Sequence, residues 1–213
     1  MPAMPAMPAA YSFTTWFRAN WSRAALPTAI LLFLLSPFLL RGISVALWLV
    51  FLQLPVYMLH QYEEHAHNAF RDFVNRMLGG GKVVLGDTAI FWINIGGVWA
   101  LDMALIYLAA YVNSVFGLLA IYLTLVNGLL HIVMAVAQRR YNPGLWTSIV
   151  LFLPVGGYAL YRVTQDTRPA LAAQLLGVGV ALLIHVAIVL YVRLNIARSR
   201  RQALTPAPAR VAE

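Results

Sequence analysis

The sequence contains no cysteine, so the chain can form neither a disulfide bond nor a thiolate metal site. Charged residues are also scarce. They make up 10% of the 213 residues, whereas a soluble domain carries about 25%. Hydrophobic residues make up 62% of the chain, and the mean hydropathy is +0.75. These values exclude an ordinary soluble domain and predict an integral membrane protein.

Acidic residues are the rarer charged class, with 7 against 15 basic residues and a net charge of +8. A basic excess can indicate nucleic-acid binding. Here, however, the basic residues lie between the apolar runs and in the C-terminal segment, which is how a membrane protein sets its orientation. We therefore expect a lipid bilayer as the partner, and no nucleic acid.

Long apolar runs recur along the chain, and about 20 apolar residues are enough for a helix to cross a bilayer. We therefore predict an all-α, polytopic transmembrane helical bundle of about six spans. The spans are expected at residues 25–40, 43–62, 86–111, 115–137, 144–161 and 170–192. The first run follows Arg18 and Arg23, as a signal peptide would, but cleavage after it would remove part of the second span. An uncleaved first helix is expected.

The two ends of the chain differ in composition from its middle. The start, MPAMPAMPAA, is a low-complexity repeat, and residues 1–23 are expected to form a disordered tail. Residues 24–197 are predicted as a single transmembrane domain, and residues 198–213 as a basic disordered tail. The link 71–85 contains three consecutive glycines and is a candidate flexible lid.

The distribution of basic residues predicts the orientation. With six spans and both termini in the cytoplasm, only three of the 15 basic residues lie outside, and they are Arg41, Arg162 and Arg168. Because cytoplasmic loops carry the excess of lysine and arginine, we expect this orientation, in the cytoplasmic membrane of a bacterium.

The second predicted span ends in a polar sequence, LHQYEEHAH. On a helix, one face about 80° wide carries His60, Glu63, Glu64, His67 and Arg71. His65 points away from this face and is expected to reach the lipid headgroups. A charge at the bilayer centre costs roughly 2.5–3.5 kcal/mol, so two adjacent carboxylates near the membrane indicate a functional site.

Polar residues in four other predicted spans lie at the same cytoplasmic depth. Asn127 and His131 share a face of the fourth span, because they are four residues apart. Asn94, Thr147 and His185 lie in the cytoplasmic halves of the third, fifth and sixth spans. We therefore expect one pocket, formed by His60, Glu63, Glu64, Asn127 and His131.

Three short motifs follow one another in this region. They are His60-Gln61-Tyr62-Glu63-Glu64, an Asn-x-x-x-His pattern from Asn127 to His131, and Tyr141-Asn142-Pro143-Gly144. In these motifs the sequence resembles the HXXEE family of membrane proteins, over residues 45–165. The family is named for its motif. The resemblance implies an integral membrane enzyme with its site at these motifs, rather than a particular reaction.

The residue types favour a metal site. Glu64 and His67 form a Glu-x-x-His step, which helical bundles use to bind iron or manganese. His60 lies one turn earlier, and His131 is expected to approach from a facing helix. We predict these four residues as ligands of one divalent metal ion, either zinc or iron, with manganese as a further possibility.

Three more residues are predicted to complete the catalytic site. Glu63 lies beside the ligands as a candidate acid or base, and Asn127 and Tyr141 can donate the hydrogen bonds that orient metal ligands. On this interpretation the protein is a metal-dependent membrane enzyme. It acts on a lipophilic or membrane-delivered substrate, by hydrolysis or by an oxygen-dependent reaction.

Two alternatives stay open. Adjacent carboxylates at low dielectric cannot both ionise cheaply, so Glu63 or Glu64 could activate water without a metal. This arrangement resembles the glutamate-based CAAX-processing proteases, although those proteins have an arginine where this chain has Asn68. The other alternative is a proton- or ion-coupled transporter or a sensor, because intramembrane glutamate and histidine can serve as proton relays.

The predicted orientation can be tested by labelling, since the native chain contributes no cysteine background. We expect single cysteines introduced at Ser114 and Ala203 to react with a membrane-impermeant thiol reagent from opposite sides of the membrane. Labelling of both positions from one side would contradict the orientation.

Overall fold

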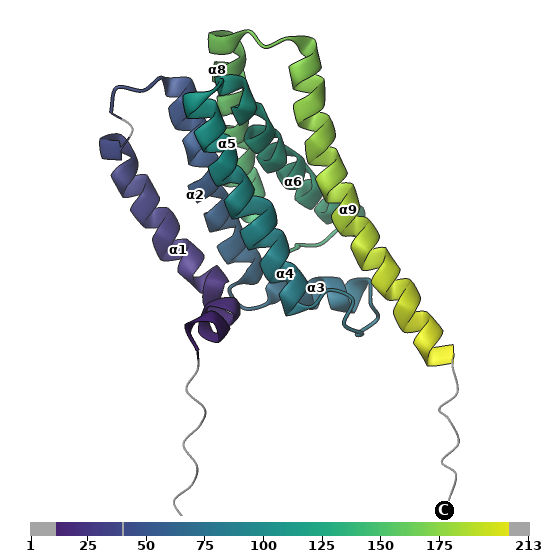
Figure 1. Ribbon diagram of the computed structural model, residues 1–213. Helices are drawn as coiled ribbons and strands as arrows, with labels where there is room; N and C mark the ends of the chain where they lie inside the picture. Colours follow the sequence, from purple (N-terminus) through teal and green to yellow (C-terminus); the bar gives the residue numbers. More distant parts are fainter. Residues whose placement is uncertain (1–11, 40, 205–213) are drawn as a thin grey trace, which may run out of the picture.

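The computed structural model of the protein describes residues 12–39 and 41–204, which form helices joined by short turns with no β-strand among them (Figure 1). The elements are α1 (Phe13–Leu39), α2 (Val45–His65), α3 (Ala69–Met77), α4 (Asp87–Asn94), η1 (Ile95–Trp99), α5 (Ala100–Tyr111), η2 (Ser114–Phe116), α6 (Gly117–Gln138), α7 (Leu145–Thr147), η3 (Ser148–Gly156), α8 (Gly157–Thr167) and α9 (Leu171–Leu204). The prediction of an all-α fold is confirmed.

Five helices are long and apolar enough to cross a membrane. They are Phe13–Leu39, Val45–His65, Asp87–Tyr111, Ser114–Gln138 and Leu171–Arg201. The fifth predicted span, 144–161, corresponds to α7, η3 and α8, which follow one another without a break but are not among these five. The polytopic helical bundle is therefore confirmed, whereas the number of six spans stays a prediction.

The outer ends of the first and last helices lie at the same end of the bundle. Figure 1 shows the start of α1 and the end of α9 on the side where α3 also lies. The segment formed by α7, η3 and α8 also runs along the bundle. The chain therefore passes through the bundle an even number of times and ends on the side where it began. The arrangement fits the predicted orientation with both termini in the cytoplasm, which itself stays a prediction.

The predicted tails are partly helical. Residues 1–11 and 205–213 lie outside the described part of the chain, but residues 13–23 belong to α1 and residues 198–204 belong to α9. The reason at the N-terminal end is packing: the rings of Phe17 and Phe91 meet edge to face at 5.9 Å, and Trp21 is buried in the same cluster. Aromatic contacts thus extend the first helix well before its apolar run begins.

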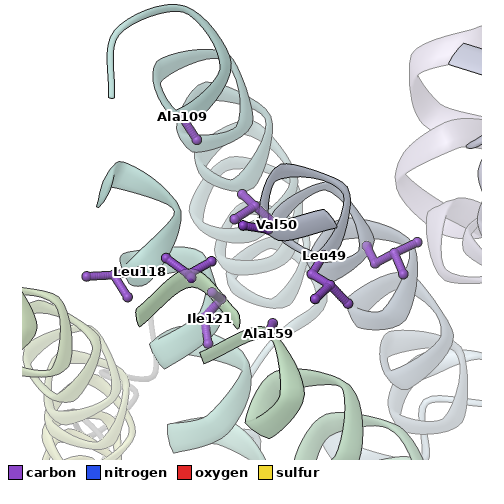
Figure 2. Close-up of a cluster of buried hydrophobic side chains, with 9 residues drawn as sticks. Leu49, Val50, Ala109, Leu118, Ile121 and Ala159 are labelled. Carbon is purple, nitrogen blue, oxygen red and sulfur yellow. The ribbon is translucent and has the colours of Figure 1, made fainter. Parts of the chain in front are cut away.

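Helix α2 lies at the centre of the bundle. In its most apolar stretch 67% of the residues are buried, against 17% for α9, which fits a central and a peripheral helix respectively. Figure 2 shows one core cluster, in which Leu49 and Val50 of α2 face Leu118 and Ile121 of α6, with Ala159 of α8 beside them. The polar end of α2 is therefore held in place by helices on several sides.

Two of the long helices contain π-helical segments next to the polar end of α2. The segment η1 begins directly after Asn94 and contains Gly96 and Gly97, while η3 begins directly after Thr147 and contains Pro154. Proline lacks the N–H group that a regular α-helix requires, and glycine tolerates irregular backbone. Because π-helical turns often occur at functional sites, both segments indicate a functional site near Asn94 and Thr147.

The link after α2, which the sequence suggested as a flexible lid, contains a short helix and a hydrogen-bonded loop. Residues 69–77 form the short helix α3, and the buried side chain of Asn75 binds the loop that follows. The N–H groups of Val84 and Leu85 both donate to Asn75 Oδ1 at 2.9 Å, and Asn75 Nδ2 donates to the carbonyl of Leu85 at 3.1 Å. The Asn75 amide thus provides hydrogen bonds to the backbone of a loop that has no regular secondary structure.

The close contact of α2 and α6 requires a glycine. A Cβ atom at Gly117 would overlap the side chain of Val50. We expect Gly117→Ala to lower the free energy of unfolding by about 1–3 kcal/mol, measured by thermal unfolding in detergent. The control is Gly179→Ala, where a Cβ atom meets no neighbour within 4 Å. In a Val50→Ala background the penalty should nearly vanish, and an unchanged penalty there would contradict this contact.

Candidate metal centre

Three buried side chains from two helices converge at the C-terminal end of α2. His60 and Glu64 come from α2, one turn apart, and His131 comes from α6. Their candidate ligand atoms all lie within 4.8 Å of one another. Glu64 Oε1 is 3.1 Å from His131 Nε2, and Glu64 Oε2 is 3.4 Å from His60 Nε2. Relative exposures of 0%, 5% and 3% for His60, Glu64 and His131 separate the cluster from bulk water.

The orientation of His131 is fixed by Asn142. Asn142 Nδ2 donates to the carbonyl oxygen of His131 at 2.9 Å, so the other amide atom, Oδ1, is an acceptor. This Oδ1 lies 2.6 Å from His131 Nδ1, which must therefore carry a proton and donate it. The second ring nitrogen, Nε2, is directed at Glu64.

The orientation of His60 is fixed in the same way by Thr147. The Thr147 hydroxyl donates to Glu63 Oε2 at 2.6 Å, and it has only one proton to give. It must then accept from His60 Nδ1, which lies 2.8 Å away. The Nε2 atom of His60 has no hydrogen-bond partner among the described residues, and it too is directed at Glu64.

His65 is buried, although the sequence analysis expected it to be exposed to the lipid headgroups. Its Nε2 atom lies 3.4 Å from Glu64 Oε2, and the ring is buried, with its centroid 5.4 Å from that of Trp21 of α1. The expectation that it reaches the headgroups is therefore wrong. The physical reason is that α1 covers the side of α2 that a helical projection leaves facing outwards.

A chain of hydrogen bonds between buried side chains determines which ring nitrogen of His65 carries the proton. Trp99 Nε1 can only donate, and it donates to Gln61 Oε1. Gln61 Nε2 then donates to Asn94 Oδ1 at 2.9 Å, which leaves Asn94 Nδ2 to donate to His65 Nε2 at 3.3 Å. His65 Nε2 is an acceptor in this chain and offers no proton to Glu64.

Glu63 lies outside the cluster and binds the segment that precedes η3. Its carboxylate accepts from the Tyr141 hydroxyl at 2.8 Å, from the N–H groups of Trp146 and Thr147 at 3.2 and 2.8 Å, and from the Thr147 hydroxyl. Partial burial and the hydrogen bond to Glu63 raise the pKa of the Tyr141 hydroxyl, so this group stays a donor at neutral pH. The two adjacent glutamates therefore have different roles.

Two other predicted site residues do not join the cluster either. His67 lies two residues after the end of α2, next to Asn68 with its φ of 57°, and is exposed. It is not part of the group that could hold a metal. Asn127 donates to the Tyr57 hydroxyl at 2.7 Å. Of the five residues expected in one pocket, His60, Glu64 and His131 come together, while Glu63 and Asn127 flank them.

Gly144 closes the cluster from the remaining side. Its φ of +97° is a left-handed conformation that favours glycine. A Cβ atom there would lie 2.7 Å from Cε1 of both His60 and His131, and 3.0 Å from Cγ of Glu64. Gly144 therefore lets the backbone of the turn touch the three side chains directly.

A large cavity reaches the cluster from the side of α9. It has a volume of about 1120 Å³, and Glu64, His65, Asn127 and His131 form part of its wall together with apolar residues of α3, α4, α6 and α9. A second, smaller and more polar cavity of about 370 Å³ lies between α1 and α4, and its lining includes Arg18, Asp87 and again His65. The cluster is thus buried but not isolated.

Comparison with known proteins identifies the family. Residues 48–159, more than half of the chain, match the family described as "Protein of unknown function with HXXEE motif", and the chain belongs to this family. No curated protein and no solved structure matches the chain. The structure gives the family motif a physical meaning here, because its histidine and second glutamate lie in the cluster, while its first glutamate anchors the turn at Gly144.

The requirement for glycine at the cluster can be tested against a matched position. Gly42 has a similar φ of +86°, but a Cβ atom there would meet nothing within 4 Å. Alanine in the left-handed region costs about 1–2 kcal/mol at either position, and only at Gly144 does it also displace the imidazoles. We expect Gly144→Ala to lower the thermal unfolding temperature in detergent clearly more than Gly42→Ala. Equal effects would show that Gly144 does not close the cluster.

Proposed function

We propose that His60, Glu64 and His131 bind one divalent metal ion, and that the protein is a metal-dependent membrane enzyme acting on a lipophilic substrate. The observation that carries this proposal is the direction of the hydrogen bonds around the cluster. Asn142 and Thr147 hold the protons of His131 and His60 on Nδ1, on the far side of each ring. Ligand histidines are commonly oriented by such hydrogen bonds.

The electrostatics of the cluster support the same proposal. With protons held on Nδ1, the Nε2 lone pairs of His60 and His65 meet the negative Glu64 carboxylate at 3.4 Å, and acceptors facing acceptors repel one another. Burial increases the free-energy cost of this repulsion, since a buried charge without compensation is unfavourable. A divalent cation between these atoms offsets the repulsion directly.

The donor set suits zinc or iron, with manganese as a further possibility. Two imidazoles and one carboxylate occur in zinc hydrolases and in non-haem iron oxygenases, and both kinds of site keep positions open for water or substrate. Bound there, the metal would act as a Lewis acid and lower the pKa of coordinated water. Zinc would indicate hydrolysis, and iron would indicate an oxygen-dependent reaction.

The residues around the cluster receive separate proposed roles. Asn127 lines the large cavity and is proposed to contact the substrate. Glu63 and Tyr141 are proposed as positioning residues, because they act on His60 only through Thr147. The predicted orientation puts the site in the cytoplasmic half of a bacterial inner membrane, which stays part of the proposal.

A metal-free hydrolase is the second candidate, and one distance favours it. His131 Nε2 lies 3.1 Å from Glu64 Oε1, which is hydrogen-bond distance. If His131 carries a second proton, the two form an ion pair that satisfies Glu64 without a metal. Elemental analysis distinguishes this pair from a metal centre.

The proposal predicts a metal that depends on Glu64. Protein purified without added metal should contain about one equivalent of zinc, iron or manganese for the single ligand cluster, and Glu64→Gln should lose most of it, since the amide is uncharged and a poorer ligand. His67→Ala is the matched control, because His67 is a neighbouring histidine outside the cluster, and it should retain the metal. Metal-free wild-type protein that keeps full catalytic activity would refute the metal proposal in favour of the ion pair.

A further inference from the structure

The large cavity continues well beyond the cluster along α9. Helix α9 packs along α6, and its C-terminal half lies beside α3 and α4 (Figure 1). On the α9 side, the wall runs from His185 past Ile188, Val192 and Ile196 to Arg200. Fifteen residues of helix separate the two ends of this wall, which corresponds to about 22 Å. The cavity is therefore elongated and exceeds the roughly 300–1,000 Å³ of common small-molecule pockets.

The lining of the cavity is mostly apolar and becomes basic towards the end of α9. Phe70, Val74 and Ile90 face the cavity opposite α9. Arg193 lines the cavity about halfway along the α9 wall and Arg200 lines its end, and neither has a hydrogen-bond or ion-pair partner among the described residues. Among the described residues of the lining, Glu64 is the only acid. The positive charge at this end is therefore not balanced within the cavity.

We propose that this cavity binds a bilayer lipid with an anionic headgroup, and that such lipids are the substrate class of the metal centre. The acyl chain lies against the apolar stripe of α9, and Arg193 and Arg200 bind the headgroup. Arginine pairs well with phosphate oxygens because it presents several N–H donors. The part of this inference that concerns chemistry rests on the proposed metal centre, whereas lipid binding does not.

The spacing of these groups supports the assignment. Arg193 lies eight residues after His185, or about 12 Å along the helix axis, and helical side chains lean towards the N-terminus of their helix. The Arg193 side chain therefore extends back towards the level of the cluster. A headgroup bound by Arg193 would therefore lie nearer to Glu64 than one bound by Arg200, which is seven residues further along α9.

The experiment compares two lipids with identical acyl chains. Binding of phosphatidylglycerol and of zwitterionic phosphatidylcholine to the detergent-solubilised protein is measured by native mass spectrometry. We expect wild-type protein to prefer phosphatidylglycerol by about tenfold, and the double variant Arg193→Gln, Arg200→Gln to lose this preference. Arg198→Gln is the matched control, because Arg198 lies on the same part of α9 but outside the lining, and it should keep the preference.

A second pair of variants tests the cavity itself. Ala187 lines the cavity and is exposed to it, whereas Leu190 is exposed on α9 outside the lining. Ala187→Trp should reduce binding of both lipids, and Leu190→Trp should not. Wild-type protein without a headgroup preference, a preference that survives in the double arginine variant, or tighter binding of free laurate than of phosphatidylglycerol would overturn the inference.

Metal analysis of the same samples separates the two proposals. If the wild type holds no metal but shows the arginine-dependent preference, lipid binding stands and the metal centre fails. If the metal is present and the preference is absent, the metal centre stands and the lipid assignment fails.

Discussion

The buried carboxylate of Glu64 is the constraint on which the arrangement of this protein depends. A carboxylate in the interior of a helical membrane bundle is tolerated only with compensation, and here imidazole nitrogens from His60, His65 and His131 lie within 3.4 Å of its oxygens. Each imidazole is in turn held by a partner outside the cluster. The structure around α2 can be understood as the set of contacts that keeps these rings in place.

These contacts come from three directions. Asn142 and Gly144 reach the cluster from the turn after α6, Thr147 from the start of the next helix, and the chain of Trp99, Gln61 and Asn94 from the side of α4 and η1. Both π-helical segments lie directly beside these groups. Both irregular segments thus begin next to side chains that reach the cluster around Glu64.

Helical periodicity was enough to predict part of the site. His60 and Glu64 lie one turn apart on the buried face of α2, and His131 lies on the face of α6 towards it, so their proximity follows from spacing alone. His67 lies outside the cluster because the helical face predicted to continue to Arg71 extends beyond the end of α2. The helix ends at His65, shortly before the left-handed Asn68. Asparagine is a known helix-terminating residue, so the sequence did contain this signal.

Other features depended on tertiary contacts that one sequence does not reveal. The burial of His65 requires Trp21, a residue in the segment expected to be a disordered tail. The roles of Glu63 and Glu64 differ because the turn at 141–147 donates hydrogen bonds to Glu63 but not to Glu64, which periodicity cannot distinguish. Asn142 occupies the unspecified position of the Tyr-x-Pro-Gly motif, so its contact with His131 could not be read from the motif.

His65 belongs to the lining of both cavities, the polar one beside Arg18 and Asp87 and the apolar one along α9. The imidazole ring of His65 therefore lies between a polar cavity and an apolar one. Glu64 lines the apolar cavity but not the polar one, so the apolar cavity borders the cluster directly and the polar cavity borders it through His65.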